Sequence, residues 1–220
     1  MKRNTTIAII DYGLGNLYSL KKALGLFAET VIITSDPKII AMADGIILPG
    51  VGAFQAGMRE IEKRKLLEPI VRFSKTGKPM LGICLGAQIM LSKGFEFGEH
   101  QGLGLVRGNV KIFPKFVSDS EKIPNIGWSE VSPAKKTKWK NTIMNGISDK
   151  SSVYFVHSYI MIPDNKTEIL SEATCGDITF CAGVKKGNIY GTQFHPEKSG
   201  EVGLKIIENF VTIANTYDKK

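Results

Sequence analysis

The sequence has 220 residues, of which 43% are hydrophobic and 23% charged, the composition of an ordinary soluble globular protein. We therefore expect residues 1–220 to form a single domain, and no apolar run is long enough to cross a bilayer, which excludes a membrane protein. The net charge of +8 comes from scattered basic residues, with no zinc-ligand spacing, RNP-like aromatic motif or helix-turn-helix pattern beside them. We expect neither a metal nor a nucleic-acid partner.

The chain has 3 cysteines, Cys84, Cys175 and Cys181. An odd number of thiols argues against a disulfide framework and favours a reducing compartment, so a cytoplasmic location is expected. Cys175 and Cys181 lie in segments that resemble strands and have no flanking glycines, and we interpret both as structural.

The first half of the chain alternates short apolar runs, typical of buried parallel strands, with segments of helical apolar spacing. The expected strands are Thr6–Asp11, Thr30–Thr34, Gly45–Leu48 and Met80–Ile83. The expected helices begin near Leu17 and Leu85 and otherwise cover Lys38–Ala43, Phe54–Arg64 and Leu66–Lys75. This alternation predicts an α/β fold with a doubly wound, mostly parallel sheet and flanking helices.

The second half of the chain has a different pattern. Glycines interrupt it at first, and short runs of alternating apolar and polar residues follow. These runs predict an additional antiparallel strand set over 109–113, 127–131, 152–159, 169–174, 180–185 and 189–194. Lys185–Asn188 suits a hairpin turn, and a final helix is expected over Gly200–Tyr217.

Gly13 and Gly15 follow the first expected strand and resemble the start of a dinucleotide-binding fingerprint. Tyr18 stands where the third glycine of that fingerprint would fall. We therefore expect no nucleotide cofactor, and no other cofactor motif is present.

The strongest local signal is Gly82-Ile83-Cys84-Leu85-Gly86, at the junction of an expected strand and helix. This is the spacing of a nucleophile elbow with cysteine in place of serine. Glycines two residues either side keep space free around a nucleophile that is held at a sharp turn. The spacing therefore predicts that Cys84 is a nucleophile, although a buried inert thiol is the alternative for this motif alone.

A second loop, Pro49–Phe54, also follows an expected strand, and ligands of open α/β sheets bind beyond such strand ends. Val51 and Gly52 are placed to offer backbone N–H groups to a substrate. A plain strand-to-helix turn explains this stretch equally well.

A nucleophilic cysteine needs a base, and histidine suits that role near neutral pH. The segment Thr192–Ser199 contains His195, with Glu197 two residues later as an orienting carboxylate. Of the other two histidines, His157 lies in a strand-like run without a nearby carboxylate and is interpreted as lining a pocket. His100 is interpreted as a surface residue.

Together these motifs resemble the class I (triad) glutamine amidotransferases, and over nearly the whole chain they resemble the glutaminase subunits of imidazole glycerol phosphate synthases. The resemblance is carried by Asp11–Asn16, Pro49–Phe54, Gly82–Gln88, Tyr154–Tyr159 and Thr192–Ser199.

The resemblance implies that Cys84 attacks the side-chain amide of L-glutamine, giving a glutamyl thioester and ammonia, while His195 shuttles the proton and Glu197 orients it. Backbone N–H groups of Leu85 and of the Val51–Gly52 loop would hold the oxyanion. Gln88, with His157, Ser158 and Tyr159, would hold the amino-acid end of the substrate.

The resemblance further implies a heterodimer in which ammonia passes through a tunnel to a (β/α)8-barrel synthase subunit, with Lys198 facing that partner. In one place the chain departs from the family, whose members usually read Pro-His-x-Gly-Trp-Asn where this chain has Asn125 and Ser129 in the corresponding positions. The ammonia acceptor could thus instead belong to surface-sugar synthesis. Two further alternatives are a cysteine protease of similar fold and a non-catalytic interaction subunit.

Overall fold

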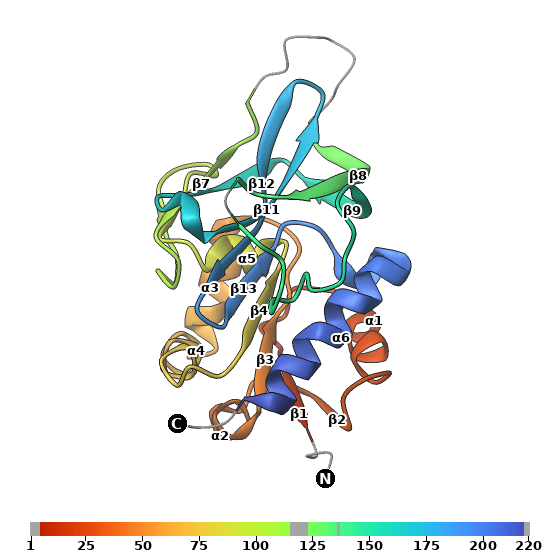
Figure 1. The fold of residues 1–220 in the computed structure, drawn as a ribbon. Helices are drawn as coiled ribbons and strands as arrows, with labels where there is room; N and C mark the ends of the chain where they lie inside the picture. Colours follow the sequence, from red (N-terminus) through yellow and green to blue (C-terminus); the bar gives the residue numbers. More distant parts are fainter. Residues whose placement is uncertain (1–4, 115–122, 136, 218–220) are drawn as a thin grey trace.

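The computed structural model describes residues 5–114, 123–135 and 137–217. Its centre is a parallel sheet of five short strands in the order β2, β1, β3, β4, β13 (Figure 1). Their bounds are β1 (Thr6–Ile10), β2 (Thr30–Thr34), β3 (Gly45–Leu48), β4 (Met80–Ile83) and β13 (Ile189–Thr192).

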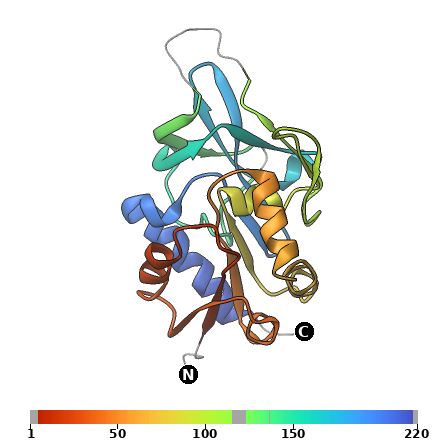
Figure 2. The same ribbon diagram turned by 180° about the vertical axis from the view of Figure 1, so that it is seen from behind.

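Helices cover both faces of this sheet, as Figures 1 and 2 show from opposite sides. Ile7 and Ile9 of β1 belong to the core beneath α1 and α6, whereas Ala8 and Ile10 belong to the core beneath α2 to α5. Strands buried on both faces are therefore apolar throughout, as the sequence suggested. The helices are α1 (Leu17–Leu24), α2 (Pro37–Met42), α3 (Phe54–Lys63), α4 (Leu67–Ser74), α5 (Leu85–Ile89) and α6 (Gly200–Thr216).

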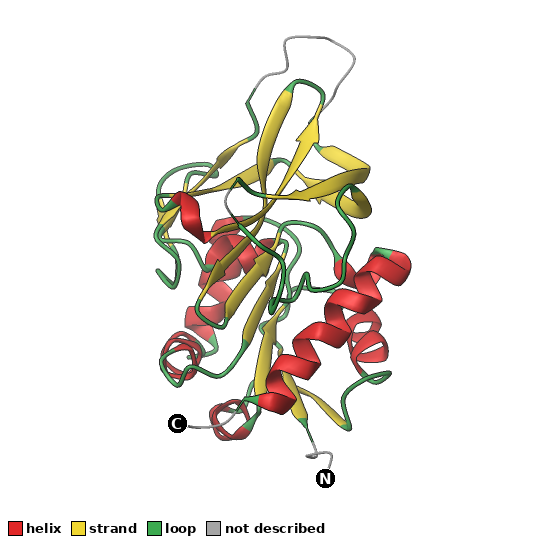
Figure 3. Ribbon diagram, viewed as in Figure 1, coloured by secondary structure: helices red, strands yellow, loops and turns green. Residues whose placement is uncertain are grey.

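A second group of strands, antiparallel except for the parallel pair of β5 with β7, continues the sheet beyond β13 and gathers at one end of the molecule, above the α-helices in Figure 3. They are β5 (Lys93–Gly94), β6 (His100–Gln101), β7 (Gly108–Ile112), β8 (Asn125–Pro133), β9 (Ser151–His157), β10 (Tyr159–Pro163), β11 (Ile169–Cys175) and β12 (Ile178–Lys186). Two short 3-10 helices are η1 (Lys166–Glu168) and η2 (Pro196–Lys198). The predicted doubly wound, mostly parallel sheet with an added antiparallel set is confirmed.

Two details of the expected strands were wrong. The run over 152–159 is not one strand, because the chain breaks at Ser158 between β9 and β10. The run over 189–194 ends at Thr192 and is not purely antiparallel: β13 pairs antiparallel with β12 but parallel with β4.

The pairing of β13 with β4 positions the site. The backbone N–H of Cys84 donates to the carbonyl of Thr192 over 2.7 Å, so the carboxyl ends of both strands meet. The chain after each strand therefore enters the same space, where ligands of open α/β sheets bind. Among the described residues, no helix is both long and apolar enough to span a membrane.

Candidate active site

Cys84 stands at the sharp turn between β4 and α5, with φ of 52° and ψ of −110°. A positive φ is strained for a residue with a side chain and is found where the surrounding structure imposes it. A Cβ on Gly86 would lie 1.7 Å from the carbonyl oxygen of Leu48, and one on Gly82 would lie 2.7 Å from backbone atoms of Ala87. The two flanking glycines are thus required by close backbone approach, as expected for an elbow.

His195 follows β13, and Nδ1 of its ring lies 2.8 Å from Oε1 of Glu197 in η2. Both side chains are almost fully buried. Burial lowers the pKa of His195, but the nearby Cys84 and Glu197 side chains outweigh it and raise the pKa to about 9. The imidazole is therefore charged at neutral pH and can act as a proton donor.

The backbone around His195 is tied to β9. The N–H of His195 donates to the carbonyl of Tyr154 over 3.0 Å, and the hydroxyl of Ser199 donates to the carbonyl of His195 over 2.7 Å. The same hydroxyl accepts from the N–H of Tyr154 over 3.0 Å. These bonds fix the imidazole next to the elbow.

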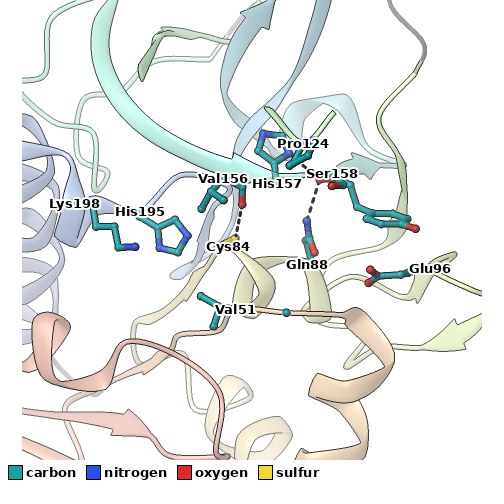
Figure 4. Close-up of a pocket in the computed structure, with 12 residues that line it drawn as sticks. Val51, Cys84, Gln88, Glu96, Pro124, Val156, His157, Ser158, His195 and Lys198 are labelled. Carbon is teal, nitrogen blue, oxygen red and sulfur yellow. Dashed lines mark hydrogen bonds between the residues drawn. The ribbon is translucent and has the colours of Figure 1, made fainter. Parts of the chain in front are cut away.

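A pocket of about 390 Å³ opens in front of Cys84 and His195 (Figure 4). Its lining includes nine residues predicted for the site: Val51, Gly52, Cys84, Gln88, His157, Ser158, Tyr159, His195 and Lys198. Two other predicted residues do not line it. Glu197 contacts the ring of His195, and the buried side chain of Leu85 packs towards Gly50 and Gly57, which leaves only its backbone for an oxyanion.

Three lining residues were missed from the sequence: Glu96, Pro124 and Val156. Glu96 belongs to the glycine-rich segment after α5, and its Oε2 accepts from the N–H of Phe54 over 2.7 Å. That bond caps the start of α3, which has no cap from its own preceding residue. An acidic residue between glycines was the only signal in the sequence.

Gln88 reaches the pocket from α5, one turn after Cys84. Its Nε2 donates to the carbonyl of Tyr159 over 3.0 Å and to Oε1 of Gln193 over 3.1 Å (Figure 4 draws the first bond). The carbonyl of Ser158 accepts from the N–H of Phe113 over 2.8 Å. The pocket wall over 157–159 is therefore held by hydrogen bonds on several sides.

The Val51–Gly52 loop forms the opposite wall. The residue at the start of this loop, Pro49, is held in place because its carbonyl accepts a hydrogen bond from the hydroxyl of Tyr12 over 2.5 Å. Burial, and after it the nearby Cys84, raises the pKa of Tyr12, so this hydroxyl stays protonated. Gly52 has φ of +105° and open space around it, which leaves its backbone accessible.

Lys198 lies where the pocket reaches the surface. Its Nζ lies 5.8 Å from the ring centroid of Tyr154, which in turn makes an edge-to-face contact with Trp128 over 6.1 Å. Ile126 and Trp128 of β8 are 60% and 58% exposed. Charge and apolar surface therefore lie side by side next to the mouth of the pocket.

His157 lines the pocket as expected. His100 is not simply a surface residue, because its Nε2 lies 3.0 Å from the carbonyl of Glu96 and it is partly buried. Cys175 and Cys181 are buried, reduced thiols. Within the described part of the chain, no cluster of three or more His, Cys, Asp or Glu side chains could hold a metal ion.

Comparison with known proteins adds to this geometry. Residues 8–214 match the family model described as glutamine amidotransferase class-I. The chain is 47% identical over 212 residues to the imidazole glycerol phosphate synthase subunit HisH 1 of Legionella pneumophila strain Lens, covering 95% of this chain and 100% of that protein. It is 44% identical over 209 residues to subunit HisH of Geobacter sulfurreducens, covering 94% and 98%.

Among solved structures, a putative GMP synthase protein from Thermoplasma acidophilum aligns with a TM-score of 0.69 at 23% identity, covering 99% of this chain and 97% of that one. PurLQS from Thermotoga maritima aligns with a TM-score of 0.69 at 20% identity, covering 96% and 99%. At these identities the likeness is one of fold.

Proposed function

This chain belongs to the class-I glutamine amidotransferases, and from that premise we propose that it is the glutaminase subunit of an imidazole glycerol phosphate synthase, acting in histidine biosynthesis. The observation that carries the proposal is that Cys84, after β4, and His195, after β13, meet at one pocket, with Glu197 hydrogen-bonded to the ring of His195. The names of the relatives at 42–47% identity support the pathway.

In the proposed reaction His195 holds the proton of Cys84 as imidazolium, and the thiolate of Cys84 attacks the side-chain carbonyl carbon of L-glutamine. The imidazolium then gives its proton to the departing nitrogen, which leaves as ammonia, and the acyl group remains as a thioester. Water, deprotonated by the now neutral His195, attacks the thioester, which releases glutamate and restores the thiolate and the imidazolium. Glu197 holds the ring through Nδ1 in both steps.

The negative charge of each tetrahedral intermediate needs backbone donors. The N–H of Leu85 directly follows the nucleophile, and the Val51–Gly52 loop lines the facing wall of the pocket. In such sites each donor lowers the barrier by about 3–4 kcal/mol. We assign the oxyanion to these groups.

The amino-acid end of glutamine would lie towards Gln88 and Glu96, since both line the pocket away from His195 in Figure 4. The carboxylate of Glu96 suits the α-ammonium group of the substrate. The side chain of Gln88 and the wall formed by His157, Ser158 and Tyr159 complete this end.

Ammonia is protonated quickly in neutral water and then is no longer a nucleophile, so a sealed route to the acceptor is needed. We propose a cytoplasmic heterodimer with a (β/α)8-barrel synthase subunit that docks over the pocket mouth. Exposed Ile126 and Trp128, next to the cationic Lys198, supply the apolar and charged surface that such an interface uses.

The test is glutamine hydrolysis by the chain alone, and with a synthase subunit from the same source plus its nucleotide substrate. We expect strong stimulation in the complex and its loss in Cys84→Ala, with partner binding retained. If the Cys84→Ala variant still hydrolyses glutamine, the assignment of Cys84 as the nucleophile is wrong. Hydrolysis without stimulation by that subunit would support glutaminase activity but show that the ammonia acceptor belongs to another pathway, such as surface-sugar synthesis.

A further inference from the structure

A second polar group lies behind the pocket wall and takes no part in the proposed reaction. Nδ2 of Asn125, the first residue of β8, lies 3.1 Å from Nε2 of His157, and Sγ of Cys175 lies 3.5 Å from Oδ1 of Asn125. Asn125 and His157 are each only 6% exposed. Buried polar groups are costly unless their hydrogen bonds are satisfied, so this arrangement constrains each member.

The contacts fix the proton on His157. Its Nδ1 lies 2.9 Å from the carbonyl oxygen of Tyr159, which can only accept, so Nδ1 must carry the hydrogen. The thiol of Cys175 donates to Oδ1 of Asn125, which turns the Nδ2 donor of the amide towards Nε2 of His157. Nε2 is therefore the acceptor, and the ring is neutral.

The surroundings of His157 agree with a neutral ring. The aromatic rings of Phe113, Phe155 and Phe180 have centroids 5.6, 5.6 and 5.1 Å from its own. The largest effect on the pKa of His157 is burial, which lowers it. The hydrogen bond to the Tyr159 carbonyl raises the pKa, and the charge of His195 lowers it. The resulting pKa is about 4.

The carbonyl of Tyr159 joins this group to the pocket, because it also accepts from Nε2 of Gln88. The amide nitrogen of Gln88 is then committed to two acceptors, Tyr159 O and Gln193 Oε1, which fixes the direction of its own oxygen. If Nδ1 of His157 lost its hydrogen, two acceptors would face each other across 2.9 Å and the Tyr159 carbonyl would have to move.

We propose that Asn125 is a positioning residue, which holds His157 as its neutral Nδ1–H tautomer and thereby fixes the Tyr159 carbonyl and the Gln88 amide for binding the amino-acid end of glutamine. The inference rests on the proposed function. Since Gln88 does not touch the reacting atoms in that scheme, the effect falls on KM for glutamine rather than on kcat.

The tautomer can be tested without activity. The chain has only 3 histidines, so the signals that are present in the imidazole 15N–1H correlation spectrum of the wild type and absent from that of His157→Asn belong to His157. We expect His157 to show a proton on Nδ1 and no titration between pH 8 and pH 5. Asn125→Asp should convert it to imidazolium near neutral pH, and Asn125→Leu should let it exchange between tautomers.

The kinetic test uses the complex with the synthase subunit. We expect Asn125→Leu to raise KM for glutamine about tenfold with kcat changed less than about threefold, the loss of roughly one hydrogen bond. Asn125→Asp retains the Nδ1 proton and should keep KM near the wild-type value. Glu29→Leu, at an exposed position just before β2 and away from both the pocket and β8, is the control.

A double-mutant cycle distinguishes an effect of Asn125 that acts through Gln88 from a general disturbance of the fold. If Asn125 acts through Gln88, Asn125→Leu should have no further effect on KM in a Gln88→Ala background. An equal effect in both backgrounds, or a wild-type His157 with its proton on Nε2, would overturn the inference. Asn125→Ser takes the place of the Leu variant should the latter fail to fold. No hydrolysis by the wild-type complex would instead overturn the proposed function, while the spectra would still decide the tautomer.

Discussion

Sγ of Cys84 lies 3.7 Å from the backbone carbonyl oxygen of Val156, and the same side chain helps to raise the pKa of His195. Among the described residues, Nε2 of His195 is buried without a hydrogen-bond partner. Val156 belongs to β9, which pairs with β8, the strand that carries the exposed Ile126 and Trp128. In the proposed complex the synthase subunit docks on this strand, so a shift of β8 on docking would be passed through β9 to the carbonyl next to Cys84.

Glu197→Gln tests the orienting carboxylate. Glu197 contributes to the raised pKa of about 9 at His195, so its removal should lower that pKa. Activity that needs the imidazolium is lost as pH rises through this pKa, and the alkaline limb of kcat/KM should therefore move to lower pH. Profiles over pH 6–10 measure the shift.

The same variant should lose about 10²-fold or more in kcat, but less than Cys84→Ala, because orientation is only part of the work of a triad. An unchanged alkaline limb would show that Glu197 does not control the ionisation of His195. Glu201→Gln, four residues further along the chain and exposed, is the control.

Glu96 combines two roles that different variants separate. Glu96→Gln keeps an oxygen for the N–H of Phe54 but removes the charge that suits the substrate ammonium. We expect KM for glutamine to rise about tenfold at unchanged Tm. Glu96→Ala removes both, and should also lower stability by about 1 kcal/mol through loss of the α3 cap. A wild-type KM in Glu96→Gln would show that the α-ammonium group of glutamine does not bind at Glu96.

Trp128→Ala tests the docking surface. An exposed aromatic beside a pocket mouth is typical of residues that dominate interfaces, and its truncation should weaken binding of the synthase subunit by about 2 kcal/mol, or roughly thirtyfold in Kd. Tm and glutamine hydrolysis by the isolated chain should not change. Met42→Ala, on α2 at the opposite end of the molecule in Figure 1 and even more exposed than Trp128, should leave binding intact. Equal binding by both variants would relocate the interface.

The parallel half of the fold could be predicted because its signals are local. Apolar runs such as Thr6–Ile10 and the spacing around Cys84 are read within a few residues. The pairing of β13 with β4 is a contact across more than 100 residues, and a short apolar strand is compatible with either direction. The break at Ser158 was missed because neither glycine nor proline marks it.

The residues of the candidate site likewise fall into those that a local motif predicts and those that only the fold brings together. Cys84, His195 and Glu197 stand in short motifs whose residue types are tied to one chemistry. Glu96 and Val156 reach the pocket only because the chain folds back over the elbow, and a single Glu or Val in a loop or strand carries no such signal. The contact of Asn125 with His157 likewise joins residues on two paired strands.

Gly86→Ala tests whether the elbow is limited by backbone packing. The added methyl would lie 1.7 Å from the carbonyl oxygen of Leu48, and no rotamer change can relieve a clash with backbone. We expect a loss of about 3 kcal/mol or more in the free energy of unfolding, measured by urea denaturation. Gly25→Ala, at the exposed end of α1 with an ordinary φ of −63°, should change it by less than about 0.5 kcal/mol. Similar stabilities for the two variants would contradict the close approach.

His157 should make stability depend on pH. Its pKa is about 4 in the folded chain and about 6.5 when unfolded, so the unfolded state binds more protons between these values. The stabilisation is complete above pH 6.5 and is lost as pH falls towards 4, by at most about 3 kcal/mol. Denaturation of wild type and His157→Asn at pH 7.5 and pH 4.5 measures the difference, with His100→Asn as the control. The wild type should lose more stability than His157→Asn on acidification, and equal losses would mean that His157 is charged or solvated in the folded protein.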